Sequence, residues 1–144
     1  ETLTRKNSQF IQKYDPSLPS IEGNEDELKQ VFLNLVKNAI EASPEEGQIR
    51  ITTQFSSNYA FRKTQDSPSM NYIIVEIIDS GLGMTDETLK NLFTPFFTTK
   101  KRGTGLGMVI SLKIIESHDG KIKVNSKKNS GTKVQVFLPV KKKW

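Results

Sequence analysis

The sequence contains no cysteine and a single histidine, and this scarcity excludes several kinds of site. Without cysteine the chain can form neither a disulfide framework nor a thiolate metal site, and the composition suits a reducing compartment. His118 alone is too little for a multi-histidine metal site or for most histidine relays. No apolar run approaches the roughly twenty residues that a membrane span needs, and we expect no signal peptide. We therefore expect a cytoplasmic chain without membrane contact of its own.

The charge pattern also lacks the features of a nucleic-acid-binding surface. The chain has 21 basic and 16 acidic residues, a net charge of +5. Part of this excess lies in Lys100–Arg102 and in the tail 141–144. A nucleic-acid-binding surface would instead interleave basic side chains with aromatic ones. We expect no nucleic-acid partner. At 144 residues, 35% of them hydrophobic, the chain forms one domain with a real core.

Hydrophobic periodicity predicts an alternation of hairpins and helices. Asn24 followed by Glu27 is typical of a capping box, and Ser43-Pro44 stops the helix that follows it. Helices are expected at 25–42, 85–92 and 106–118, strands at 48–55, 72–79, 121–126 and 132–140, and short edge pieces near Phe10 and Ile21. Because hairpins give antiparallel pairs, we predict an α+β fold. It is a two-layer α/β sandwich with a mixed, mostly antiparallel sheet covered on one face by about three helices.

Two glycine-rich stretches predict the recognition of a nucleotide. Asp79 ends a buried apolar strand and is followed by Gly81 and Gly83, so its carboxylate suits an exocyclic amine better than a phosphate. Residues 103–107 carry three alternate glycines at the start of a helix, which places bare N–H groups and the helix dipole near an anion. Taken singly, each stretch also fits an ordinary turn or a flexible loop.

Three polar side chains lie beside the buried stripe of the first long helix. At 100° per residue, Asn34, Asn38 and Glu41 fall within about 60° of each other. Their oxygens could hold Mg²⁺ through carbonyl groups and water. The alternative is that the two amides cap neighbouring backbone.

Two further features allow more than one interpretation. Phe93, Phe96 and Phe97 precede the basic stretch 98–102, which suggests a mobile flap on an aromatic anchor. The alternative is that the phenylalanines are simply core, and we expect this of some of them. His118 ends the last helix, where an interaction with the helix dipole is the ordinary role.

These motifs follow the order found in one known family. They resemble the N box (34–39), the G1 box (79–84), the F box (93–97) and the G2 box (103–107) of the ATP-binding catalytic domain of sensor histidine kinases, and Gly131-Thr132 before the last strand is also typical. The resemblance runs from about residue 10 to 140. It is nearest to the nitrogen-regulatory and sporulation-type kinases of two-component systems. It implies the Bergerat-type fold, with an ATP lid, that DNA gyrase, the MutL ATPase and a heat-shock chaperone share.

The resemblance also implies ATP and Mg²⁺ as cofactors and a role for each matching residue. Asp79, supported by Thr132, would accept from the adenine amino group, and Asn38, helped by Asn34, would hold Mg²⁺. The implied cofactor-binding residues are Asn38, Asp79, Gly81, Gly83, Met84, Phe93, Gly103, Thr104, Gly105, Leu106, Gly107 and Thr132. The implied catalytic residues are Asn34, Lys100 and Arg102. The positively charged side chains of Lys100 and Arg102 would reach the γ-phosphoryl group as the lid closes.

The residue at position 34 indicates transfer of the γ-phosphoryl group to a protein side chain and not hydrolysis of ATP. Hydrolysing relatives have a water-activating glutamate there, and the amide of Asn34 cannot act as a base. The expected acceptor is a histidine on a preceding dimerisation domain of the same kinase, with a response regulator downstream, and the parent could be membrane-anchored. We do not expect His118 to be the acceptor. Residues 1–9 would be residual linker, 10–140 the catalytic domain and 141–144 the tail, so the chain alone would not label itself.

Two alternatives stay open from the sequence. One is a serine kinase of the anti-sigma-factor type, which shares the fold. The other is a catalytically inactive nucleotide-binding interaction module.

Overall fold

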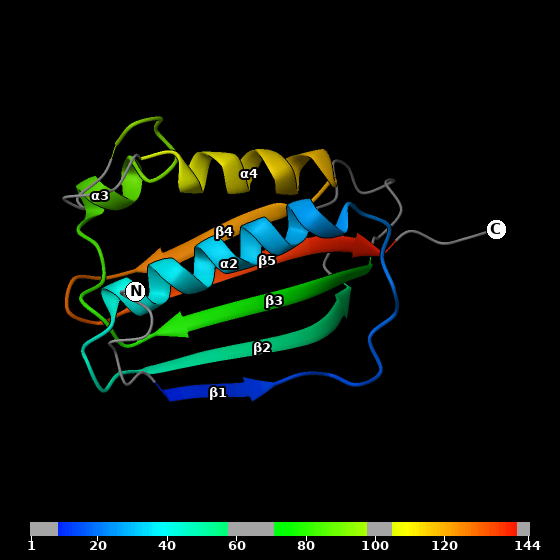
Figure 1. Cartoon of the computed structure of the whole chain (residues 1–144), viewed down its shortest axis with the longest axis horizontal. Coiled ribbons are helices and arrows are strands. Elements are labelled where there is room, and N and C mark those ends of the chain that lie inside the picture. The colour runs from blue at the N-terminus through cyan, green and yellow to red at the C-terminus, as the bar shows by residue number, and fades with distance from the viewer. Residues whose placement is uncertain (1–8, 58–70, 98–104, 141–144) are drawn as a thin grey trace.

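The computed structural model describes residues 9–57, 71–97 and 105–140 (Figure 1). Its elements are β1 (Gln9–Lys13), α2 (Glu25–Ala42), β2 (Gln48–Ser57), β3 (Asn71–Asp79), α3 (Asp86–Lys90), α4 (Gly107–Ser117), β4 (Lys121–Ser126) and β5 (Thr132–Val140). The predicted helices and strands are confirmed, and the edge piece near Phe10 is β1. The piece expected near Ile21 is not a strand, because this segment leads directly into α2.

The sheet is mixed and mostly antiparallel, as predicted. Its five strands are ordered β1-β2-β3-β5-β4, with β1 parallel to β2 and all other neighbours antiparallel. In Figure 1, α2 and α4 lie over one face of the sheet, and α3 lies beside the start of α4. The helix α2 packs against the central strand β3, and α4 packs against the edge strand β4.

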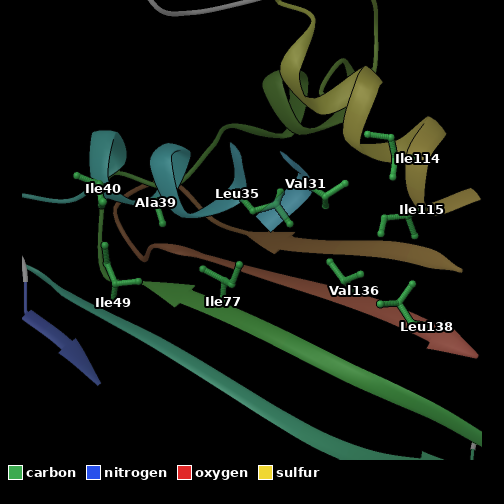
Figure 2. Packing of buried hydrophobic residues seen from close by; sticks show 10 residues of the cluster. All are labelled: Val31, Leu35, Ala39, Ile40, Ile49, Ile77, Ile114, Ile115, Val136 and Leu138. Atoms are coloured by element: carbon green, nitrogen blue, oxygen red, sulfur yellow. The ribbon is translucent and has the colours of Figure 1, made fainter. Parts of the chain in front are cut away.

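The core lies between the helix layer and the sheet. Figure 2 shows buried aliphatic side chains from both layers that point toward each other. They are Val31, Leu35, Ala39 and Ile40 of α2, Ile114 and Ile115 of α4, and Ile49, Ile77, Val136 and Leu138 of the sheet. Their removal from water is the main force that holds α2 and α4 against the strands.

Only half of the predicted capping box forms at the start of α2. The side-chain oxygen of Asn24 accepts from the backbone N–H of Glu27 at 3.0 Å, as expected of an N-cap. The backbone N–H of Asn24, however, donates to Nε2 of His118 at 3.0 Å, where a capping box would use the Glu27 side chain. The histidine ring at the end of α4 takes this place, so it joins the two helices.

The helix α4 is less buried than its composition suggests. Ser111 is only 2% exposed, whereas the apolar Ile110 is 40% exposed. Because α4 packs on α2 and the sheet from one side only, its opposite side faces solvent whatever residues it carries. Within the three described ranges, none of the helices has the length and apolar character needed to cross a membrane.

Candidate nucleotide-binding site

Asp79 is the buried polar group at the centre of the candidate site. It ends β3, it is 7% exposed, and it lies opposite Thr132 of β5 in the antiparallel register. The backbone N–H of Gly81 donates to its Oδ1 at 2.9 Å. The turn after the strand thus folds back on the carboxylate and fixes its orientation.

Burial and hydrogen bonding act in opposite directions on this carboxyl group. Burial is the larger effect and raises the pKa of Asp79, because a charged carboxylate is poorly solvated there. The backbone N–H groups of Gly81 and Thr132 donate to it and lower the pKa in part. A buried acceptor of this kind is suited to a ligand that supplies a further donor.

The loop after Asp79 is held by contacts on two sides. The backbone N–H of Leu82 donates to the carbonyl of Ala42 at the end of α2 (3.2 Å), and the carbonyl of Leu82 accepts from the N–H of Asn129 (2.6 Å). Gly83 has φ of +65°, and a Cβ there would collide with the carbonyl of Lys127. Only glycine fits this position without strain, so the loop and the β4–β5 turn pack as one unit.

The asparagines of α2 face the start of α4. Nδ2 of Asn34 donates to Oγ of Ser111 at 3.2 Å, and Nδ2 of Asn38 lies 3.4 Å from Sδ of Met108. A Cβ at Gly107 would lie 2.6 Å from Oδ1 of Asn34, so the helices approach closely here. The structure therefore brings the predicted N box beside the end of the predicted G2 box.

These contacts partly support the alternative to a metal site, in which the asparagine amides bind neighbouring parts of the protein. The amide nitrogens of Asn34 and Asn38 contact side chains of α4, Ser111 and Met108. Among the described residues there is no cluster of three or more histidine, aspartate or glutamate side chains that could hold a metal. Amide oxygens fit Mg²⁺ only as partial ligands, with the remaining positions filled by water or phosphate.

None of the three phenylalanines of the predicted F box is buried in the core, so the expectation that some of them are core is wrong. Phe96 is 74% exposed with φ of +67°, and Phe93 is half-buried. The backbone N–H of Phe96 donates to the carbonyl of Gly105 at 3.0 Å, which joins the two ends of the segment predicted as the flap. Lys100, Arg102, Gly103 and Thr104 lie outside the described residues.

Of two hollows in the described surface, only the smaller adjoins the candidate site. The larger, of about 710 Å³, lies along α2 between Ile21 and Val36 and has no predicted site residue in its wall. A smaller one of about 230 Å³ adjoins Gly83 and Met84. The contacts around Asp79, and not the size of a hollow, locate the site.

With this geometry in place, comparison with known families gives a match over residues 23–142, to histidine kinase-, DNA gyrase B-, and HSP90-like ATPases. The chain belongs to this family.

The curated relatives of this ATPase-family chain are histidine kinases, as the resemblance implied. It is 41% identical over 124 residues to sporulation kinase E of Bacillus subtilis, covering 86% of this chain and 15% of the relative. It is 40% identical over 137 residues to the sensory histidine kinase/phosphatase NtrB of Azospirillum brasilense, covering 94% and 34%. The chain thus spans about a third or less of these relatives.

A solved structure agrees with the fold. The catalytic domain of the histidine kinase ThkA, in a nucleotide-free form, matches with a TM-score of 0.72 and 36% identity. The match covers 92% of this chain and 79% of that one. The predicted two-layer fold is therefore confirmed.

Sequence reasoning missed two serines beside the site. Ser111 accepts from Asn34, and a serine in an otherwise apolar helix stretch was a usable signal. Ser126 contacts both the loop after Asp79 and Thr132. It ends a strand of alternating polar residues, so nothing local distinguishes it.

Proposed function

We propose that this chain binds Mg-ATP and donates the γ-phosphoryl group to a histidine on a separate dimerisation domain of the same kinase. The observation that carries the proposal is the buried carboxylate of Asp79, oriented by Gly81 and paired in register with Thr132. Family membership and relatives that are histidine kinases support it.

Each part of the described site has a distinct task in this proposal. Asp79 accepts a hydrogen bond from the adenine amino group, with Thr132 beside it. The loop around Gly81 and Gly83 lies against the base. Asn38, helped by Asn34, holds Mg²⁺ through amide oxygens. The metal supplies charge neutralisation for the phosphates when bound.

The start of α4 would hold the phosphates. Gly105, Leu106 and Gly107 bring backbone N–H groups and the positive end of the α4 dipole near the asparagines. Gly103, Thr104, Lys100 and Arg102 are proposed to complete this anion site from the lid. The protein's contribution to phosphoryl transfer is then positioning and electrostatic stabilisation.

Binding is tested by titrating the 144-residue chain with Mg-ATP in a calorimeter. We expect saturable binding at one site, weakened when Asp79 is changed. A flat titration of the folded chain would overturn the proposal.

Transfer is tested with γ-labelled ATP and a separately produced, histidine-bearing dimerisation domain. We expect acid-labile label on that domain and none on this chain alone. Acid-stable label on a serine would instead support the serine-kinase alternative, and binding without any transfer would support the inactive module. The response regulator as a downstream partner follows only if histidine is labelled.

A further inference from the structure

Ser126 connects three groups at the edge of the site. Its Oγ accepts from the backbone N–H of Met84 at 2.8 Å, donates to the carbonyl of Gly131 at 3.1 Å, and lies 2.8 Å from Oγ1 of Thr132. Ser126 is the last residue of β4, and Thr132 is the first of β5 and its partner in register. One hydroxyl thus joins the loop after Asp79 to the strand opposite Asp79.

The chemistry of these three groups fixes the direction of every hydrogen bond. The N–H of Met84 can only donate, and the carbonyl of Gly131 can only accept. The single proton of Ser126 therefore goes to Gly131, so the hydroxyl of Thr132 must donate to Ser126. No other assignment satisfies all three contacts.

This assignment determines what Thr132 can offer to a ligand. With its proton committed to Ser126, Oγ1 of Thr132 has only lone pairs left and acts as an acceptor. Asp79 is Thr132's partner across β3 and β5, so both side chains leave the same face of the sheet. The side chains of Asp79 and Thr132 thus present two acceptors on the same face of the sheet.

We infer that Ser126 is a positioning residue that makes the site select a 6-amino purine over a 6-oxo purine. This inference rests on the proposed function, because it assumes that the base lies against Asp79 and Thr132. An amino group at position 6 donates to both acceptors. A carbonyl oxygen at that position faces their lone pairs and is repelled.

The test compares the affinities of Mg-ATP and Mg-ITP, since inosine replaces the 6-amino group by a 6-oxo group. Calorimetry gives the ratio of the two dissociation constants for the wild type and for Ser126→Ala. Without Ser126 the Thr132 hydroxyl can turn and donate to the 6-oxo group. We expect the preference for ATP to fall about 2- to 10-fold, the equivalent of one neutral hydrogen bond.

Two further variants separate this role from a structural one. Ser126→Thr keeps a hydroxyl and should restore the wild-type ratio. Thr132→Val removes the hydroxyl that reads the base and should narrow the ratio even with Ser126 intact, so it serves if Ser126→Ala fails to fold. If Ser126→Ala or Thr132→Val weakens both nucleotides by the same factor and leaves the ratio unchanged, the inference is wrong. Should the wild type bind no ATP, the proposed function itself fails.

Discussion

At Asp79, the ligand contact that we propose comes at some expense to the stability of the fold. Its carboxylate is 7% exposed and accepts from the backbone N–H of Gly81. This donor and the backbone N–H of Thr132 offset only part of the cost of desolvation, because burial still raises the pKa of Asp79. A bound amino group would supply the missing donor.

The substitution Asp79→Asn should separate binding from stability. It keeps the shape and one acceptor oxygen but removes the charge. We expect Mg-ATP affinity to fall roughly 10- to 150-fold, as for loss of a charged hydrogen bond. At neutral pH, the variant should melt at a higher temperature than the wild type, since the buried charge is gone. Calorimetric titration and circular dichroism melting measure the two effects.

The pH dependence of that stability difference follows from the direction of the shift. Because the folded-state pKa of Asp79 is raised, the folded chain holds this proton more tightly than the unfolded chain. The resulting stability is fully present below the unfolded carboxyl pKa and is lost as the pH rises through the folded one. As the pH falls through the acidic range, the wild type should therefore become more stable relative to Asp79→Asn. A difference that stays constant with pH would contradict this.

Asn34 offers a test of transfer against hydrolysis. In the proposed site no carboxylate occupies this position, and the amide donates to Ser111. A glutamate there would supply the base that the hydrolysing relatives use, so Asn34→Glu should raise phosphate release from Mg-ATP at least about 10-fold, well within the range of general-base catalysis. Asn34→Gln is the matched control and should show no rise. An unchanged rate in Asn34→Glu would count against the assignment.

Among the elements, α2 and α4 are joined at both ends. Near the site, Asn34 and Asn38 contact α4. At the far end, Nδ1 of His118 lies 2.7 Å from the carbonyl of Ile114 in its own helix, and Nε2 accepts from Asn24. The neutral ring with its proton on Nδ1 satisfies both contacts. The histidine thus contacts a carbonyl of its own helix through Nδ1 and links that helix to α2 through Nε2, and the second contact was not predicted.

The variant His118→Lys distinguishes a helix link from a dipole interaction. A lysine places a positive charge at the end of α4 but has no acceptor for the N–H of Asn24. We expect it to lower the free energy of unfolding by about 0.5–1.5 kcal/mol, as His118→Phe should. Glu116→Gln, on the exposed side of the same helix, should stay within about 0.5 kcal/mol. Urea denaturation measures all three, and a neutral or stabilising lysine would favour the dipole role alone.

The elements could be predicted from sequence because each is encoded locally. The apolar stripe of α2, the alternation of β2 and the glycine turn after β3 need no partner to be recognised. The same holds for Asp79, Asn34 and Asn38, which belong to ordered motifs. Ser126 and the link from His118 to Asn24 could not be predicted in this way, since each depends on which strand or helix end lies opposite. The exposure of Phe96 likewise depends on tertiary packing.

At the scale of the whole molecule, the proposed site draws its residues from four elements. Asp79 comes from β3, Thr132 from β5, the asparagines from α2 and the glycine turn from the start of α4. All the core residues labelled in Figure 2 except Ile49 of β2 belong to the same four elements. A ligand that contacts all four would therefore oppose global unfolding as well as local opening.

This arrangement predicts a thermal shift that depends on an intact Asp79. Mg-ATP at about 100 times its dissociation constant should add ~2.7 kcal/mol to the free energy of unfolding, or roughly 6–12 °C in melting temperature for a chain of this size. Asp79→Asn at the same nucleotide concentration should shift much less, although its own melting temperature starts higher. The opposite order of the two proteins with and without nucleotide is the decisive feature. We expect this reversal because the same carboxylate carries the desolvation cost in the empty fold and accepts from the adenine amino group in the proposed complex.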